Sequence, residues 1–180
     1  MTKTLVLLIA LLSFQMATAQ STDEDKSSPL YYEWKNETFP IDTLVSYNND
    51  TLILSENNKV FVINFWFTTC QPCIAEIKWL NKLQEDYACD SLAFISISFN
   101  SKKEIDAFIK TKPYNFQLFH LEKEIINEHA LVKGYPTTLI LDSTGKVILY
   151  KVGAPKDETL AESVYEELAE ELIKLGAVKH

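Results

Sequence analysis

Closely spaced cysteine pairs, clusters of basic residues and long apolar runs are scarce in this chain, and each scarcity argues against a class of protein. Cys70 and Cys73 are the one closely spaced pair among its three cysteines. A structural zinc site needs four ligands, and no second pair is present. The remaining candidates, Cys89, His120 and His129, do not have the spacing of a zinc finger.

The charge pattern argues against nucleic-acid binding. The formal net charge is −8, and the lysines are scattered without a basic stripe that alternates with aromatic residues. Internal repeats and low-complexity tracts are absent as well. With 180 residues and 47% hydrophobic content the chain can bury one sizeable core, so we expect one globular domain.

The N-terminus carries an apolar run that is short for a membrane span, which needs about 20 residues. Lys3, the run from Leu5 to Leu12 and the small residues Ala17-Thr18-Ala19 follow the order of a secretory signal peptide. No cysteine follows this run, which disfavours a lipid anchor. We therefore predict an exported protein with no stable membrane insertion after cleavage.

The predicted division of the chain follows from this N-terminus. Residues 1–19 form the signal peptide, and residues 20–37 are expected to be a flexible lead because they begin with a polar and charged stretch. The folded domain is expected to comprise residues 38–176.

The segment Cys70-Gln71-Pro72-Cys73 stands between a predicted strand and a predicted helix. Residues 60–66 form an apolar, β-branched and aromatic run that fits a buried strand, and residues 74–87 carry apolar side chains at helical spacing. Two intervening residues put both sulfurs on one face of the first helical turn, at a Cα separation of about 5–6 Å that a disulfide can span. The pair can therefore open and close without rearrangement of the backbone.

Cys70 is the predicted nucleophile of this pair. At a helix N-terminus it faces unpaired backbone N–H groups and the positive end of the helix dipole, which favour the thiolate. Cys73 lies one turn inside, so we expect it to be less exposed and suited to resolving a mixed disulfide. Pro72 suits a first turn because its missing N–H costs nothing there. A structural disulfide and half of a metal site remain alternatives for a lone motif of this kind.

Two motifs together resemble the thioredoxin superfamily. Asn64-Phe65-Trp66 leads into the cysteine motif, and Gly134-Tyr135-Pro136-Thr137-Thr138 follows downstream. Residues 38–175 are most similar to the TlpA/ResA-like branch of secreted bacterial thiol–disulfide oxidoreductases. The resemblance implies an α/β, thioredoxin-like three-layer fold in which helices flank a central mixed sheet.

The order of the other segments resembles that branch. Turn residues at 47–50 separate two apolar segments, which predicts an N-terminal β-hairpin. A helix that begins after Ser101 and the strand that follows it form an extra helix–strand insertion. The last helix is expected to bury Leu160, Val164, Leu168 and Leu172 on one face and to end at Gly176. These further elements are predicted as strands at 41–46, 51–55, 91–99, 116–119, 137–142 and 146–152, and as helices at 101–110, 122–132 and 157–175.

The family resemblance implies a cis bond between Tyr135 and Pro136 that faces the cysteine pair. Such a turn would leave the Tyr135 backbone free to pair with an extended substrate segment. The alternative is an ordinary proline that starts a strand. We expect Tyr135 and Pro136 to bind substrate together with Trp66, Thr69 and Pro72. Thr69 stands where many family members have Trp, so it is expected to change the surface that partners contact.

Glu76 is the predicted proton acceptor. It lies on the apolar helix track of Cys73, Leu80 and Leu83, where burial would raise its pKa towards neutrality and let it take the proton of Cys73. The TlpA/ResA-like branch carries a functional glutamate at this position. Thioredoxin has a buried aspartate where this chain has Asn64, which cannot relay a proton, and this departure favours Glu76. The alternative is a solvated helix carboxylate.

The predicted function is that of a periplasmic thiol–disulfide oxidoreductase, monomeric and without cofactor. The resemblance suggests that it reduces cysteine-containing envelope proteins with electrons from a membrane partner. A thiol peroxidase is an alternative, although Phe67 and Ile63 stand where peroxiredoxins have Thr or Ser and Pro. Another is a copper carrier that uses the two cysteines and a histidine. Cys89 is expected to be an inert, partly buried thiol.

Overall fold

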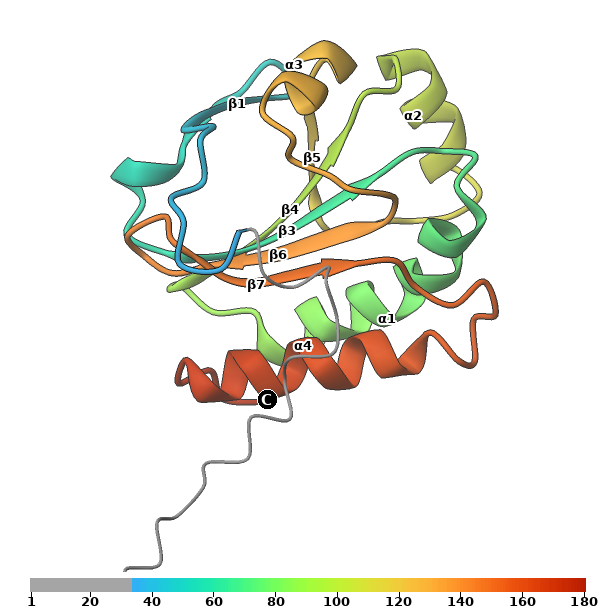
Figure 1. The fold of residues 1–180 in the computed structure, drawn as a ribbon. Helices are drawn as coiled ribbons and strands as arrows, with labels where there is room; N and C mark the ends of the chain where they lie inside the picture. The colour runs from blue at the N-terminus through green and yellow to red at the C-terminus, as the bar shows by residue number, and fades with distance from the viewer. Residues whose placement is uncertain (1–33) are drawn as a thin grey trace, which may run out of the picture.

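A computed structural model describes residues 34–180, and the predicted signal peptide lies outside these residues. One seven-stranded mixed sheet forms the centre of the domain, in the order β2-β1-β5-β4-β3-β6-β7 (Figure 1). The strands are β1 (Thr43–Ser46), β2 (Thr51–Ile53), β3 (Val60–Trp66), β4 (Leu92–Ser98), β5 (Gln117–His120), β6 (Thr137–Leu141) and β7 (Val147–Val152). The helices are α1 (Gln71–Tyr87), α2 (Lys102–Ile109), α3 (Lys123–Glu128) and α4 (Glu162–Lys174), with a 3-10 turn at Leu54–Glu56.

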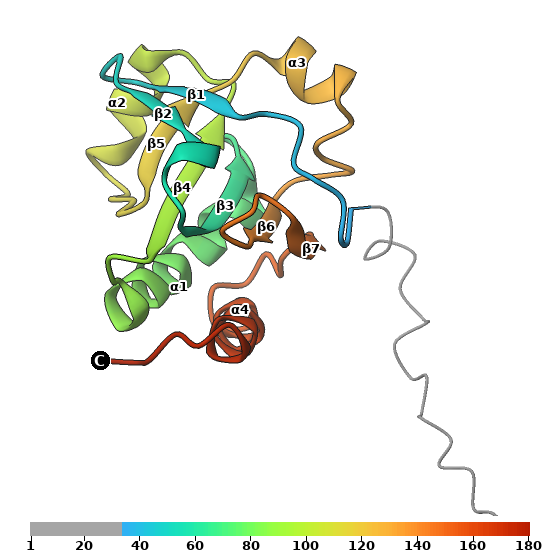
Figure 2. The ribbon, with the colours of Figure 1, turned by 90° about the vertical axis from the view of Figure 1, so that its left-hand side faces the viewer.

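The strand pairing places the two motifs at one end of the sheet. β3, β4 and β5 are parallel, while β6 runs antiparallel to β3 and pairs Thr137 with Phe65. Pro136, which precedes Thr137, therefore lies beside the end of β3 from which the chain continues to Cys70. β1 and β2 extend the far side of the sheet beyond β5, as the turned view shows (Figure 2).

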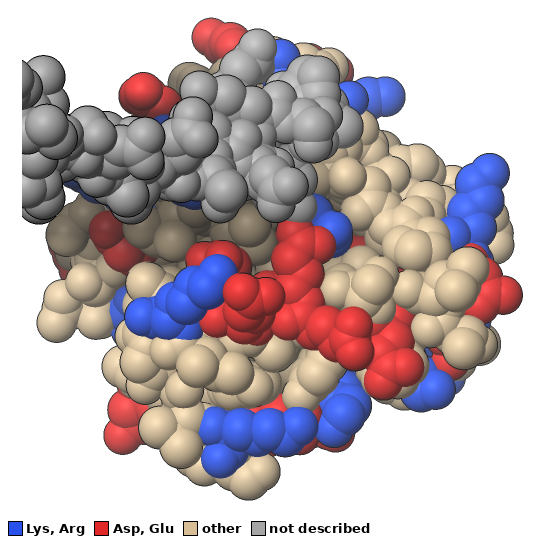
Figure 3. All heavy atoms as spheres, turned by 60° about the horizontal axis from the view of Figure 1, so that its bottom comes forward, with Lys and Arg blue, Asp and Glu red and all other residues tan. Residues whose placement is uncertain are grey.

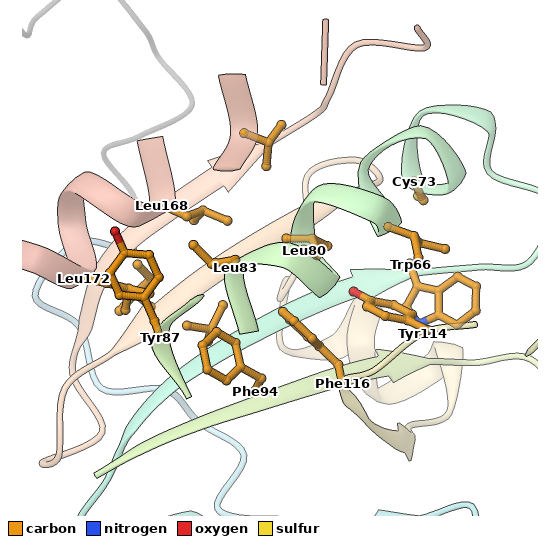
Figure 4. Close-up of a cluster of buried hydrophobic side chains, with 14 of the residues drawn as sticks. Trp66, Cys73, Leu80, Leu83, Tyr87, Phe94, Tyr114, Phe116, Leu168 and Leu172 are labelled. Carbon is orange, nitrogen blue, oxygen red and sulfur yellow. The ribbon is translucent and has the colours of Figure 1, made fainter. Parts of the chain in front are cut away.

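Each face of the sheet is covered by its own hydrophobic cluster. β3 alternates: Val62 and Trp66 point to the face covered by α1 and α4, whereas Phe61, Ile63 and Phe65 point to the opposite face, where α3 lies (Figure 1). In the first cluster Leu80 and Leu83 of α1 meet Leu168 and Leu172 of α4 (Figure 4). The α/β three-layer arrangement is thus the predicted one.

Most predicted elements are confirmed. The N-terminal hairpin is present as β1 and β2, and the helix–strand insertion is present as α2 and β5. Ser101 caps α2 through a complete capping box with Glu104. Gly145 and Gly176 take the positive φ values, 80° and 89°, that end a hairpin turn and a helix. α3 is shorter than predicted, since the chain leaves the helix at His129 and Ala130 has a φ of 48°.

The last helix also starts later than predicted, and the expectation that Leu160 is buried was wrong. The Asp157 carboxylate accepts hydrogen bonds from the backbone N–H groups of Thr159 and Leu160, which hold a turn ahead of α4. Leu160 therefore lies outside the helix and is 65% exposed. Glu162, Glu166 and Glu170 of α4 are exposed, and Glu167 and Glu171 are half-buried. Acidic and lysine side chains lie side by side on this surface (Figure 3).

The folded domain begins before residue 38. Asn36 donates its backbone N–H to the Val147 carbonyl at 2.8 Å, and Val147 donates in return to Glu37 at 2.9 Å. Residues 34–37, which we assigned to the flexible lead, are therefore tied to the edge of β7. No helix within residues 34–180 is both long and apolar enough to cross a membrane.

Candidate active site

The cysteine pair lies at the N-terminus of α1. Cys70 is the N-cap residue, and its Sγ accepts a hydrogen bond from the Cys73 backbone N–H at 3.3 Å. The two residues form a disulfide with a Cα separation of 5.2 Å, within the expected range. Cys70 is 5% exposed and Cys73 1%. Cys70 is the more exposed of the two, as expected. It is nevertheless largely enclosed, because it packs in the hydrophobic cluster under α1.

The rim of the pair is built by two loops. The Tyr135–Pro136 bond is cis, as the resemblance implied, and Tyr135 is half-buried while Pro136 is buried. In the segment that carries the cysteines, Thr69 is exposed and Pro72 half-buried. Of the predicted substrate-binding residues, Thr69, Pro72 and Tyr135 are therefore at least partly accessible, whereas Pro136 is buried.

Trp66 does not belong to that surface, and its assignment to substrate binding was wrong. It is 1% exposed, and its ring packs 5.0 Å from the ring of Phe108. The ring of Tyr114 is 5.4 Å away and lies beside it in Figure 4. The alternation of β3 turns its side chain into the core beneath α1. Trp66 therefore supports the site from inside.

Phe67 and Phe99, which were not among the predicted substrate-binding residues, form an aromatic cluster with Tyr135. The rings of Phe67, Phe99 and Tyr135 lie 5.2 to 5.9 Å apart in three mutual contacts, and all three residues are half-buried. Phe99 also lines an open groove of about 780 Å³ together with Val45, Tyr47 and His120. Phe67 and Phe99 directly follow β3 and β4, and Tyr135 comes shortly before β6. An aromatic residue next to each of these strand ends is the sequence pattern that could have predicted the cluster.

The loop before Cys70 is held by the end of β4. The Asn100 side-chain Oδ1 accepts a hydrogen bond from the Thr68 backbone N–H at 2.9 Å. Tyr47, which follows β1, donates its hydroxyl to the backbone carbonyls of Ser98 and Asn100 at 3.1 and 2.8 Å. The N-terminal hairpin is thereby connected to the loop that carries the disulfide.

Glu76 is buried under the pair, and the alternative of a solvated carboxylate is excluded because the residue is 1% exposed. Burial raises its pKa to about 8, against the opposing effects of a hydrogen bond from Asn64 and the positive charge of Lys151. A carboxyl with such a pKa exchanges protons near neutrality. On α1 it lies three residues after Cys73, on the same helix face.

A buried polar network surrounds Glu76, and only part of it was anticipated. Asn64 Nδ2 donates to Glu76 Oε1 and to Thr138 Oγ1, each at 2.9 Å. The Tyr114 hydroxyl donates to Asn64 Oδ1, also at 2.9 Å. The sequence pointed to Asn64 as a departure from thioredoxin, but no local pattern pointed to Tyr114 or Thr138.

The third cysteine differs from expectation. Cys89 is exposed rather than partly buried, and its Sγ lies 3.3 Å from the Ser91 hydroxyl. His129 is exposed, and His120 pairs with Glu122. Within residues 34–180, no group of three or more His, Cys, Asp or Glu side chains is arranged to hold a metal ion.

Known proteins resemble this chain along most of the folded domain. The model of the AhpC/TSA family matches residues 37–150. The thioredoxin-like protein YneN of Bacillus subtilis is 33% identical over 152 residues, which cover 82% of this chain and 87% of YneN. The thiol-disulfide oxidoreductase ResA of Bacillus thuringiensis is 29% identical over 107 residues. That match covers 58% of this chain and 61% of ResA, less than two thirds of the relative.

The fold is shared with solved structures as well. A crystal structure from Chlorobium tepidum assigned to thiol:disulfide interchange protein DsbE superposes with a TM-score of 0.64. It is 23% identical, and the match covers 78% of this chain and 94% of that one. The chain therefore belongs to the AhpC/TSA family and is a thioredoxin-like thiol–disulfide oxidoreductase of the thioredoxin superfamily.

Proposed function

We propose that this oxidoreductase is exported and reduces disulfides in cysteine-containing proteins of the cell envelope. The observation that carries the proposal is the disulfide at the N-terminus of α1 with a buried carboxyl, Glu76, on the same helix face. The N-terminal signal sequence supports export. Export leads to an oxidising compartment, where a dithiol must be re-reduced by a dedicated membrane donor.

The reductive cycle begins with the Cys70–Cys73 dithiol. The Cys70 thiolate attacks one sulfur of the target disulfide, so that the target S–S bond breaks, a mixed disulfide forms and one target thiolate leaves. Backbone N–H groups at the start of α1 stabilise the attacking thiolate. After this step the target is still bound to Cys70 through the mixed disulfide. Its reduction is complete only when that bond is resolved.

Resolution uses Cys73 and Glu76. Glu76 takes the proton of the Cys73 thiol, and the resulting thiolate attacks the Cys70 sulfur and releases the second target thiolate. Two electrons have then passed from the dithiol to the target, and the Cys70–Cys73 disulfide remains. A dithiol of the membrane donor restores the pair by the reverse exchange.

The substrate-binding surface comprises Thr69, Pro72, Tyr135 and Pro136, with the rings of Phe67 and Phe99 beside them. The cis turn at Pro136 leaves the Tyr135 backbone available to an extended segment of the target. The half-buried aromatic rings offer apolar contacts to side chains that flank the target cysteine. The target is thus an extended, accessible cysteine segment.

Reduction of insulin by the purified domain tests the chemistry. Cys70→Ser should abolish activity, because no other thiol is placed to attack, while the control Cys89→Ser should retain it. Cys73→Ser should accumulate the mixed disulfide.

Glu76→Gln should slow the reaction and alter its pH profile, whereas Glu166→Gln, which changes an exposed carboxylate, should do neither. Full activity of Cys70→Ser would defeat the assignment of Cys70, and an unaltered profile of Glu76→Gln would remove that residue from the mechanism.

Cell fractionation with thiol trapping tests export and direction. We expect the mature protein to start at Gln20, to fractionate outside the cytoplasm and to carry the Cys70–Cys73 pair mainly as a dithiol. A steady-state disulfide in cells would contradict the reductive direction.

A further inference from the structure

A chain of buried hydrogen bonds connects Tyr114 to Glu76. The Tyr114 hydroxyl donates to Asn64 Oδ1, and Asn64 Nδ2 donates to Glu76 Oε1, each at 2.9 Å. All three residues are buried, with exposures of 8%, 1% and 1%. Tyr114 reaches the site from the segment between α2 and β5, the insertion that a minimal thioredoxin lacks.

Around an ionised Glu76, the hydrogen-bonding groups that contact Asn64 admit one orientation of its amide. Both N–H groups of Nδ2 are used, one by Glu76 and the other by Thr138, so Oδ1 must meet a donor. The hydroxyl of Tyr114 is that donor. A reversed amide would place its oxygen against Glu76 Oε1, which only a protonated carboxyl could satisfy, so ionisation of Glu76 requires the orientation in which Nδ2 donates to it.

The position of Tyr114 is itself fixed by packing. Its ring contacts the rings of Trp66 and Phe116, with centroids 5.4 and 5.1 Å away, and Figure 4 places it beside Trp66 under α1. A ring packed in this way keeps its hydroxyl at one place, so the hydrogen bond to Asn64 is preorganised.

We propose that Tyr114 is a positioning residue that, through Asn64, holds an N–H donor against Glu76 and so governs when this carboxyl can take the proton of Cys73. The inference rests on the role proposed for Glu76 above. It assigns a function to the inserted segment between α2 and β5, which supplies one end of the network.

The other groups that act on Glu76 come from three sides. Cys73 precedes it on α1, Thr138 of β6 shares the Asn64 donor, and Lys151 of β7 contributes a positive charge while paired with Glu167 of α4. Lys151 and the Asn64 donor both favour the carboxylate, whereas burial opposes it. Loss of the Tyr114 hydroxyl should therefore weaken one of the two groups that counteract burial.

The expected effect of Tyr114→Phe is a rise in the pKa of Glu76 of less than about one unit, the size of one lost hydrogen bond to the carboxylate, because the Asn64 donor is loosened and not removed. Such a rise would reduce the ionised fraction of Glu76 at neutral pH by less than about tenfold, and resolution by Cys73 would slow accordingly.

The test measures the pH titration of the Glu76 carboxyl carbon by NMR in the disulfide form, with the resonance identified by its loss in Glu76→Gln. Tyr114→Phe should move the midpoint upward. The matched control is Tyr165→Phe, which removes a hydroxyl hydrogen-bonded to Asp86 on the surface and should leave the midpoint unchanged. An unchanged midpoint in Tyr114→Phe would overturn the proposal.

A measurement on the unaltered protein decides the question even if Tyr114→Phe does not fold. The Asn64 side-chain amide and the Tyr114 ring carbon that bears the hydroxyl should titrate with the midpoint of Glu76. Constant resonances of both groups through that transition would refute the coupling. Neither measurement requires turnover, so a failure of the proposed function would appear separately, as an unaltered activity profile of Glu76→Gln.

Discussion

At the scale of single residues, Glu76 is a carboxyl in an environment very different from water. A carboxyl that is 1% exposed loses its hydration, and one hydrogen bond from Asn64 replaces only part of it. Its pKa is raised from 4.5 to about 8, so the folded protein holds a proton that the unfolded chain releases between these values.

This difference predicts how stability depends on pH. Because the folded pKa of Glu76 is the higher one, its contribution to stability is fully present below pH 4.5 and is lost as the pH rises through about 8. Glu76→Gln should lack this loss. Between pH 5 and pH 8 the free energy of unfolding of the disulfide form should fall less in the variant than in the unaltered protein, and the two decreases should differ by about 2–4 kcal/mol.

Chemical denaturation of the disulfide form across this pH range measures the effect. The control Glu166→Gln should follow the unaltered protein, since Glu166 is exposed on α4. Parallel pH profiles of Glu76→Gln and the unaltered protein would mean that Glu76 is ionised in the folded state throughout.

At the scale of elements, the packing of α4 on α1 holds the helix that carries the cysteines. Leu168 and Leu172 of α4 are fully buried against Leu80 and Leu83 of α1. α1 and α4 also lie side by side in both ribbon views (Figures 1 and 2). α4 and α1 thus lie side by side on one face of the sheet, and their contact helps to keep the N-terminus of α1 and the disulfide in place.

Two leucines that sequence periodicity placed on the same face should therefore differ in mutation. Leu168→Ala should lower the free energy of unfolding by about 2–5 kcal/mol, because it leaves a cavity in the core. Leu160→Ala should change it by less than about 0.5 kcal/mol, because Leu160 is solvent-exposed in the turn before α4. Urea denaturation of both variants makes the comparison, and equal losses would place Leu160 in the core after all.

At the scale of the whole molecule, Asp86 ties three distant parts of the chain together. Its carboxylate oxygen Oδ2 accepts from Lys82 of α1 at 2.9 Å, Tyr165 of α4 at 2.6 Å and Lys179 of the C-terminal segment at 2.9 Å. The hydrogen bond from Lys82, with those from Tyr165 and Lys179, holds the pKa of Asp86 well below its usual range.

Asp86→Asn should therefore destabilise the protein in a pH-dependent way. A depressed folded pKa contributes stability above the unfolded value of about 3.8, and this contribution is lost as the pH falls through and below it. The variant should be less stable than the unaltered protein at pH 7, and the difference should shrink below about pH 4.

Thermal unfolding at pH 3 and pH 7 gives the comparison. Asp106→Asn is the control, because the ion pair of Asp106 with Lys102 is exposed. A difference of the same size at pH 3 and pH 7 would show that the charge of Asp86 is not what joins these segments.

The sequence by itself determined the features that local interactions control. The spacing of Cys70 and Cys73 at a helix N-terminus dictates a bridgeable geometry, the Ser101–Glu104 capping box starts α2, and the apolar, β-branched and aromatic run in residues 60–66 specifies a strand with two buried faces. Each depends on neighbours within one or two turns, so the pattern of residues is sufficient to predict it.

Only the tertiary structure decided how these parts meet at the site. Tyr114 and Asn64 are 50 positions apart and Asn64 and Thr138 are 74, and no local spacing links them. The enclosure of Cys70, the burial of Trp66 and the exposure of Leu160 were likewise settled by which surfaces the fold brings together. Hydrogen bonding and burial between distant residues depend on the packing of whole elements, which the order of residues within one element does not specify.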